Sequence, residues 1–225
     1  MADGRPVIAV IGGTGKLGNA LARGWARAGY QIVIGSRDPA RAKAAAAAIA
    51  QETTAQASGD SNLRAARQGG LLVVTVPYGS QLATLEEIAS AAEGKILVDA
   101  TVPLRPPKVA RVQLPPEGSA AVAGQAMLGP GVSVVSAFHN VAAHKLAADG
   151  AVDCDVLVFG DSKRARQQVV ALAEALGLRG LHGGPLANSA AAEAMTSLLI
   201  FINRTYSVDG AGVRITGELK PPQES

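Results

Sequence analysis

The sequence predicts an α/β fold in which a doubly wound parallel sheet is followed by a small C-terminal α/β unit. Short apolar runs alternate with helical segments through the first two thirds of the 225 residues, a pattern typical of a parallel sheet with helices on both faces. A glycine-rich turn joins the first apolar run directly to a helical pattern. From about residue 140 the elements become fewer, and we expect them to pack against the crevice at the carboxyl ends of the strands.

The expected elements follow from apolar periodicity and from turn residues. Strands are predicted near 7–11, 31–35, 54–57, 71–76, 95–99 and 132–136, and helices near 16–29, 39–51, 61–68, 80–92 and 119–127. The alanine-rich run 42–50 is strong helix-forming sequence, and the five prolines of 101–118 predict an irregular connection. The C-terminal unit is predicted as a helix near 140–147, a strand at 154–159, a helix at 163–176, a strand at 178–182 and a helix at 187–204.

These elements suggest a division of the chain into three parts. Residues 1–138 form the expected N-terminal domain, residues 139–217 the small C-terminal α/β domain, and residues 218–225 a frayed tail.

The turn after the first strand carries the pattern Gly-x-Gly-x-x-Gly, formed by Gly13, Gly15 and Gly18. In this pattern the first glycine permits the tight turn, the second lets a pyrophosphate approach the backbone, and the third lets the helix pack closely on its strand. The N–H groups and the dipole at the helix start then favour phosphate. A plain tight turn is the alternative, but the position between strand and helix favours a dinucleotide-binding Rossmann domain.

The end of the second strand discriminates between NAD and NADP. An NAD site would place an acidic residue there for the ribose hydroxyls, whereas this chain has Ser36 and Arg37, with Arg41 one helical turn later. A hydroxyl and two guanidinium groups suit a 2′-phosphate, although both arginines could instead be solvated positions at a helix start. Asp38 precedes Pro39 and is expected to cap that helix. The sequence therefore favours NADP.

Composition excludes several classes of protein. No apolar run reaches the length that spans a bilayer, so we expect no membrane association. A single cysteine, Cys154, allows no internal disulfide and forms no metal-binding pattern, which suggests a cytoplasmic setting. The net charge of +3 is scattered and only 3% of residues are aromatic, so anionic small molecules are expected as partners in preference to nucleic acid.

Several further stretches resemble one family. They are Thr75-Val-Pro-Tyr78, Ser136-Ala-Phe-His-Asn-Val-Ala, Gly160-Asp161, and Gly184-Pro-Leu-Ala-Asn-Ser189 followed by Glu193 and Thr196. Together with the glycine loop and Gly35-Ser36-Arg37, they resemble the NADPH-dependent reductases of coenzyme F420, the deazaflavin:NADP oxidoreductases. This resemblance covers nearly the whole chain. It implies reversible hydride transfer between NADPH and the deazaflavin, with NADP and coenzyme F420 as the two carriers.

The resemblance also implies site residues. It assigns the pyrophosphate to Thr14, Gly15, Lys16 and Leu17, the 2′-phosphate to Ser36, Arg37 and Arg41, the nicotinamide side to Pro77 and Tyr78, and the deazaflavin ring to His139 and Val141. Val76, Thr101 and Val102 follow expected strands and Ala137 follows another, so they are candidates to line the crevice. The chain departs from the family at Ala190, where family members usually carry an arginine.

Both expected carriers are organic hydride carriers, so the chemistry requires no acid–base residue from the protein. His139 follows a strand end, and it is either a ligand-contacting residue or a structural histidine bonded to backbone. Likewise Asn188 and Ser189 either cap the last helix or contact a ligand. An NADPH-dependent flavin or ferric reductase and a non-catalytic NADP-binding regulator remain as alternatives. A homodimer or a higher homo-oligomer is expected, and the sequence leaves the physiological direction of transfer open.

Overall fold

The computed structural model describes residues 4–148 and 152–220. Its strands are β1 (Ile8–Ile11), β2 (Ile32–Ser36), β3 (Ala57–Ser61), β4 (Leu71–Val74), β5 (Ile96–Asp99), β6 (Ser133–Ser136), β7 (Asp155–Phe159) and β8 (Arg179–Gly184). Its α-helices are α1 (Lys16–Arg27), α2 (Pro39–Glu52), α3 (Asn62–Gln68), α4 (Gln81–Ala92), α5 (Ala120–Leu128), α6 (Ala143–Ala147), α7 (Lys163–Glu174) and α8 (Ser189–Tyr206), and two short 3₁₀ turns are η1 (Tyr78–Ser80) and η2 (Leu186–Asn188).

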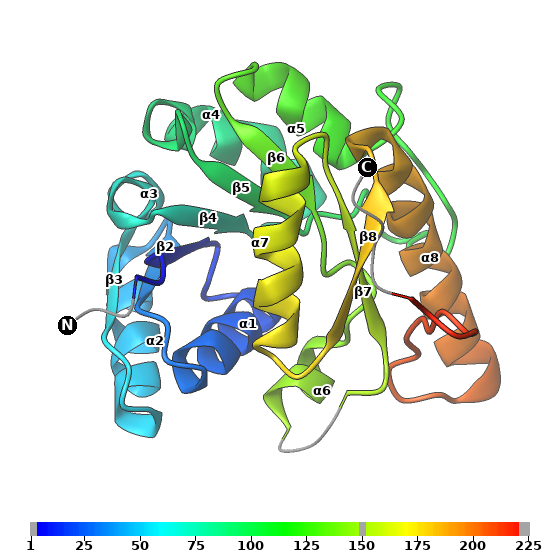
Figure 1. The fold of residues 1–225 in the computed structure, drawn as a ribbon, viewed down its shortest axis with the longest axis horizontal. Coiled ribbons are helices and arrows are strands. Elements are labelled where there is room, and N and C mark those ends of the chain that lie inside the picture. The colour runs from blue at the N-terminus through cyan, green and yellow to red at the C-terminus, as the bar shows by residue number, and fades with distance from the viewer. Residues whose placement is uncertain (1–3, 149–151, 221–225) are drawn as a thin grey trace.

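All eight of these strands belong to one sheet in the order β3-β2-β1-β4-β5-β6-β7-β8 (Figure 1). The strands from β3 to β6 are parallel, so their carboxyl ends meet at one edge. The strand order reverses between β1 and β4, which is the switch point where ligands bind in doubly wound sheets. The predicted α/β fold is confirmed.

Successive side chains along each strand point to opposite faces of the sheet, so the hydrophobic core has one part on each face. In β1, Ile8 and Val10 pack with α1, α2 and α7, whereas Ala9 and Ile11 pack with α3, α4 and α5. Trp25 of α1 is fully buried and donates from Nε1 to the carbonyl of Leu172 in α7 at 2.9 Å. The N-terminal and C-terminal parts of the chain therefore share one hydrophobic layer.

The C-terminal strands extend the same sheet. β7 runs antiparallel to β6 and meets it at the single pair Ser136 and Phe159, and β8 then pairs with β7 in parallel. The proposed boundary between residues 138 and 139 falls in the segment between β6 and β7 and stays a prediction. The expected tail, 218–225, lies partly outside the described residues.

One expected strand lies at a different place. The short strand predicted near 54–57 is β3, at Ala57–Ser61, because α2 continues to Glu52 and a bend at 53–55 follows it. Thr53 caps α2, and both its N–H and its hydroxyl donate to the carbonyl of Ile49. The pairing with β2 then begins only at Ala57.

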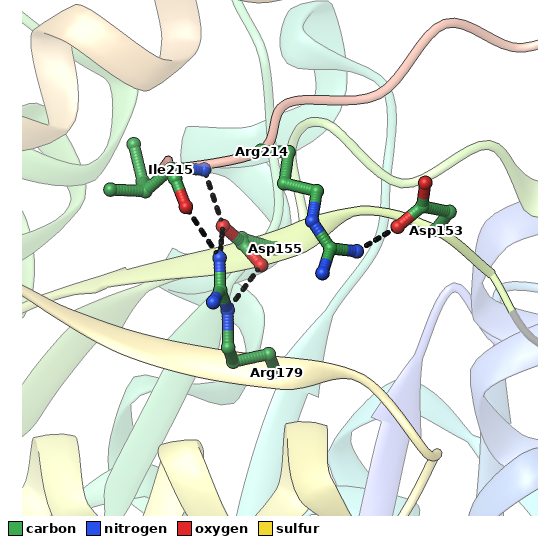
Figure 2. Close-up of polar contacts among 5 residues, drawn as sticks. All are labelled: Asp153, Asp155, Arg179, Arg214 and Ile215. Atoms are coloured by element: carbon green, nitrogen blue, oxygen red, sulfur yellow. Dashed lines mark hydrogen bonds and ion pairs between the residues drawn. The ribbon is translucent and has the colours of Figure 1, made fainter. Parts of the chain in front are cut away.

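The segment after α8 returns to β7 and is held there by a buried carboxylate (Figure 2). Asp155, at the start of β7, accepts two hydrogen bonds from Arg179 of β8 at 2.6 and 2.7 Å and one from the N–H of Ile215 at 2.6 Å. The hydrogen bonds from Arg179 hold the pKa of Asp155 below its usual value. This pairing fixes the position of the C-terminal segment relative to the edge of the sheet.

Candidate functional site

A cavity of about 360 Å³ lies at the carboxyl ends of β1, β2 and β4, at the switch point of the sheet. Of the predicted site residues, seven line it: Thr14, Gly15, Ser36, Arg37, Arg41, Val76 and Pro77. The remaining lining residues are Gly12, Asp38, Asn62, Thr75, Ser80 and Thr84. The structure thus brings together the glycine loop, the end of β2 and the segment after β4, as the sequence predicted.

The glycine loop has the close packing that its pattern predicts, with one difference. A Cβ on Gly18 would lie 2.9 Å from Gly13 Cα and would clash with Thr75, so only glycine lets α1 approach β1 and β4 this closely. The left-handed backbone of the turn, however, lies at Gly12, with φ of +75°, and not at Gly13. The N–H groups of both residues donate to the carbonyl of Gly35, which joins the loop to the end of β2.

Gly15 differs from the other loop glycines because it lines the cavity and a Cβ there would have one close contact, with a backbone oxygen. It has the extended backbone that precedes α1, with φ of −75° and ψ of 163°. A Cβ there would lie 3.3 Å from the Gly12 carbonyl oxygen and within 4 Å of no other atom of the described residues. The first turn of α1 therefore presents its N–H groups toward a space that a side chain would fill.

The end of β2 supplies positive charge to the cavity. Neither Arg37 nor Arg41 forms a side-chain hydrogen bond or ion pair with any residue that the structure describes. Asp38 also lines the cavity, but its carboxylate caps α2 by accepting from the N–H groups of Ala40 at 2.9 Å and Arg41 at 3.3 Å, as predicted. The two guanidinium groups are therefore available to bind an anion. The 2′-phosphate of NADP requires such cationic hydrogen-bond donors.

Asn62 is a polar group of this cavity that sequence analysis did not identify. It begins α3, is 2% exposed, and its Oδ1 is buried without a hydrogen-bond partner among the described residues. Its Nδ2 donates to Glu87 at 3.2 Å. An unpaired buried acceptor in a cavity lined by arginines is consistent with a polar ligand at this place.

Other lining residues were missed for lack of a local signal. Thr75 belongs to the motif Thr75-Val-Pro-Tyr78, but the sequence does not indicate that its side chain lines the cavity. Ser80 and Thr84 lie on the turn and helix after β4, where the sequence shows only a helical pattern. Thr84 donates to the carbonyl of Ser80 at 2.7 Å, which holds this turn against the helix.

The residues predicted for the nicotinamide side continue from the cavity. Tyr78 follows Pro77 in η1, and the guanidinium of Arg105 lies 5.6 Å from the centre of its ring. This contact joins the proline-rich connection to the turn after β4. Lys16 and Leu17 lie in the first turn of α1, where Lys16 is exposed and Leu17 packs against the core.

The residues predicted for the second carrier do not line this cavity. Ala137, His139 and Val141 are buried at the end of β6, and Thr101 is buried after β5. Val102 is partly buried beside Thr101. They lie at the same edge of the sheet as the cavity because β5 and β6 run parallel to β4.

His139 has the environment of a fixed, neutral group. Its Nε2 lies 2.9 Å from Ser136 Oγ, and burial lowers its pKa to about 4 despite the opposing effect of the Asp99 backbone. Thr196 of α8 donates to the carbonyl of His139 at 3.2 Å. The imidazole is therefore uncharged at neutral pH, and the backbone of His139 is joined to α8 through Thr196.

A buried polar network connects α8 to the rest of this edge. Glu193, 1% exposed, accepts hydrogen bonds from the N–H groups of Ala120 at 2.7 Å and Ala121 at 3.1 Å, at the start of α5. Burial raises the pKa of Glu193 to about 7, and the charge of Asp99 adds to this increase. Asp99, at the end of β5, accepts from Gln81 and from the N–H of Thr101, and burial raises its pKa as well.

Ser189 donates to Ser119 Oγ at 2.8 Å, and Ser119 in turn caps α5 by accepting from the N–H of Val122 at 3.0 Å. Asn188 does not cap α8 through its side chain, because its Nδ2 donates to the carbonyl of Gly183 at 3.0 Å. The sequence allowed either helix capping or ligand contact for Asn188 and Ser189. In the structure Ser189 connects α8 to α5, and Asn188 connects it to β8.

Among the described residues, no three His, Cys, Asp or Glu side chains are grouped so as to hold a metal ion. None of the helices in the described ranges has the length and hydropathy to cross a membrane.

Comparison with known proteins agrees with this site. Residues 7–103 match the family model described as NADP oxidoreductase, coenzyme F420-dependent. The chain is 38% identical over 218 residues to an F420-dependent NADP reductase of Methanothermobacter marburgensis, covering 93% of this chain and 97% of the relative. It is 39% identical over 227 residues to the protein of the same name from Methanothermobacter thermautotrophicus, covering 96% and 97%.

Among solved structures, the chain is similar to a candidate F420-dependent NADP reductase from Arthrobacter sp. FB24. The TM-score is 0.81 at 26% sequence identity, and the match covers 95% of this chain and 100% of the other. The similarity therefore extends over the C-terminal strands and α8 as well as over the glycine loop.

Proposed function

The chain belongs to the family of F420-dependent NADP reductases, and on that basis we propose that it catalyses reversible hydride transfer between NADPH and the deazaflavin coenzyme F420. One observation carries this proposal: the cavity at the switch point combines the glycine loop with Arg37 and Arg41, whose side chains pair with no other described residue. Similarity to reductases of this name over more than nine tenths of the chain supports the second carrier.

The protein's task in this reaction is to bind and orient. Thr14, Gly15 and the first turn of α1, including Lys16 and Leu17, would hold the pyrophosphate, with Gly13 and Gly18 shaping the loop beneath it. Ser36, Arg37 and Arg41 would hold the 2′-phosphate. When bound, NADPH supplies a hydride at its nicotinamide, and Val76, Pro77 and Tyr78 would orient that end.

We propose that Thr101, Val102, Ala137, His139 and Val141 form the wall of the deazaflavin site. Because most of them are buried, their role is to shape a surface of fixed form and to exclude water. A neutral His139, whose imidazole is held by Ser136 and whose carbonyl accepts from Thr196, can shape this wall without exchanging a proton. No residue of the chain is assigned acid–base catalysis.

The test of this function follows NADPH oxidation with coenzyme F420, with free flavins, with ferric iron, and with a panel of imines and keto acids. We expect turnover with coenzyme F420 and much slower turnover, or none, with flavins. Turnover confined to flavins or ferric iron would support the alternative reductase, and tight NADPH binding with no turnover of any acceptor would support a regulator.

Replacing Arg37 tests the assignment of the 2′-phosphate. Arg37→Ala is expected to raise the KM for NADPH at least about tenfold, because a charged hydrogen bond contributes roughly 1.5–3 kcal/mol. The KM for NADH, which lacks the phosphate, should change little. The matched control is Arg164→Ala, an exposed arginine on α7. Equal catalytic efficiency of the unaltered protein with NADPH and NADH would contradict the assignment.

We propose that the protein is a homodimer or a higher homo-oligomer, with α8 at the interface. Leu198, Ile202 and Tyr206 are 54%, 37% and 73% exposed and lie four residues apart, so they form one apolar stripe. A twofold axis would pair two such stripes. Leu198→Glu combined with Ile202→Glu should give a monomer in sedimentation velocity, whereas Gln167→Glu with Ala171→Glu on exposed α7 should not. An unaltered protein that sediments as a monomer would contradict this proposal.

We further propose that the protein works in the cytoplasm on anionic cofactors, without nucleic-acid or membrane partners. The single cysteine and the scattered positive charge support this assignment.

A further inference from the structure

A second cavity with positive charge lies outside the dinucleotide site. It has a volume of about 340 Å³ and is formed by the proline-rich connection and the C-terminal half of α8. Its lining residues are Lys108, Ala110, Arg111, Phe201, Arg204 and Thr205. Half of these residues are cationic, and Phe201 and Ala110 contribute apolar surface.

The three cations of this cavity have no acidic partner among the residues that the structure describes. Lys108, Arg111 and Arg204 form no side-chain hydrogen bond or ion pair with any part of the chain that the structure describes. Residues 100–116 contain no Asp or Glu, and neither do residues 194–208. Asp209, the next acidic residue after α8, contacts His144 and Lys145 instead. Unpaired cations around one cavity favour an anionic ligand.

Local hydrogen bonds hold the connection in the form that builds this cavity. The N–H of Lys108 donates to the carbonyl of Arg105, and the N–H of Arg111 donates to the carbonyl of Lys108, both at 3.1 Å. Ser197 of α8 donates to the carbonyl of Arg111 at 3.3 Å, which joins the connection to the helix. Lys108 and Arg111 are therefore presented by two successive turns that are fixed to α8.

The proline-rich connection and α8 link this cavity to the proposed site of the second carrier. Arg105, three residues before Lys108, contacts Tyr78 beside the dinucleotide cavity. On the other side, Thr196 contacts His139, and Arg204 lies eight residues later on the same helix, about 12 Å along its axis. A chain that leaves the ring site along the surface of α8 would pass the exposed Phe201 and reach the three cations.

We propose that Lys108, Arg111 and Arg204 bind the anionic tail of the deazaflavin co-substrate. This inference rests on the proposed function and adds to it a binding site for phosphate and carboxylate groups, remote from the reacting ring.

The experiment compares coenzyme F420 with a deazaflavin that has the same ring and no anionic tail. Binding of each compound is measured by calorimetry without NADPH, and turnover with NADPH is measured in parallel. Arg111→Ser combined with Arg204→Ser should raise the Kd of coenzyme F420 about tenfold, after allowance for solvent screening of exposed charges. The Kd of the tail-less compound, the KM for NADPH and kcat should change little. Added salt should weaken binding of coenzyme F420 more than binding of the tail-less compound.

The control is Arg67→Ser combined with Arg164→Ser, which removes two exposed arginines from α3 and α7 and lowers the net charge equally. An equal rise in the Kd of coenzyme F420 in the control would mean that only overall charge matters, and this would overturn the site. An unchanged Kd in the Arg111/Arg204 variant, or an equal rise for both compounds, would also overturn it. If the unaltered protein oxidises NADPH with neither compound, the proposed function fails and the tail site fails with it.

Discussion

Gly15→Val is expected to abolish NADPH binding in a protein that still folds. The backbone at Gly15, with φ of −75° and ψ of 163°, is one that valine adopts readily, so folding requires only a shift of a few tenths of an ångström at the Gly12 carbonyl. Its new side chain would point into the cavity, because nothing but the Gly12 carbonyl oxygen, at 3.3 Å, lies within 4 Å of the Cβ position among the described residues. The valine methyl groups would then occupy the space that the pyrophosphate needs. We expect the Kd for NADPH to rise at least about 100-fold, or roughly 2.7 kcal/mol.

Calorimetric titration with NADPH measures this loss, and thermal unfolding verifies the fold. Gly70→Val is the matched control: Gly70 lies outside the cavity, and a Cβ there would lie 3.5 Å from Pro6 in ordinary contact. Other loop glycines are poorer tests, since Gly12 requires a positive φ and Gly18 would clash with Thr75. If the folded Gly15 variant retains NADPH affinity, the loop is only a turn.

Glu193 is expected to make the stability of the protein depend on pH between about 4.5 and 7. Burial raises the pKa of this carboxyl from its ordinary value of 4.5, which holds in the unfolded chain, to about 7 in the folded chain. Between these two values the folded state keeps the proton and the unfolded state does not, so the free energy of unfolding falls as pH rises. The free energy of unfolding therefore falls by up to about 3 kcal/mol across this window.

Glu193→Gln isolates this effect because the amide does not titrate. The variant has one acceptor for the two N–H groups of Ala120 and Ala121, which changes stability by an amount that does not vary with pH. The free energy of unfolding of the unaltered protein, minus that of the variant, should therefore fall from pH 4.5 to 7 and stay level above. Chemical denaturation at several pH values measures it, with Glu174→Gln on exposed α7 as the control substitution. A constant difference across the window would contradict the predicted ionisation.

Much of the dinucleotide cavity follows from short stretches of sequence. The strand at Ile8–Ile11, the glycine loop and α1 are contiguous, so their mutual geometry depends on local turns. Ser36, Arg37 and Arg41 are likewise local to the end of β2, and Asp38 caps the helix that carries Arg41. Their convergence with Val76 and Pro77 follows from parallel strands, whose carboxyl ends meet at one edge.

The long-range features could not be inferred in this way. The N–H groups of Ala120 and Ala121 donate to Glu193, which lies 73 and 72 residues later in the chain. The residues around each partner contain no motif that predicts this contact. Similarly, Asn62 reaches the cavity only because α3 begins where β3 ends. The antiparallel entry of β7 places its carboxyl end at the opposite edge from those of β1–β6.

The sequence by itself therefore determined the α/β class, the glycine loop and the NADP-type charge at the end of β2, because each depends on residues close together in the chain. Tertiary structure alone decided that β7 and β8 extend the same sheet, that His139 and Val141 are buried, and that α8 is joined to α5 through Glu193. These features depend on contacts between segments that are distant in the sequence. Such contacts gain free energy only when the whole chain folds, so no short stretch of sequence indicates them.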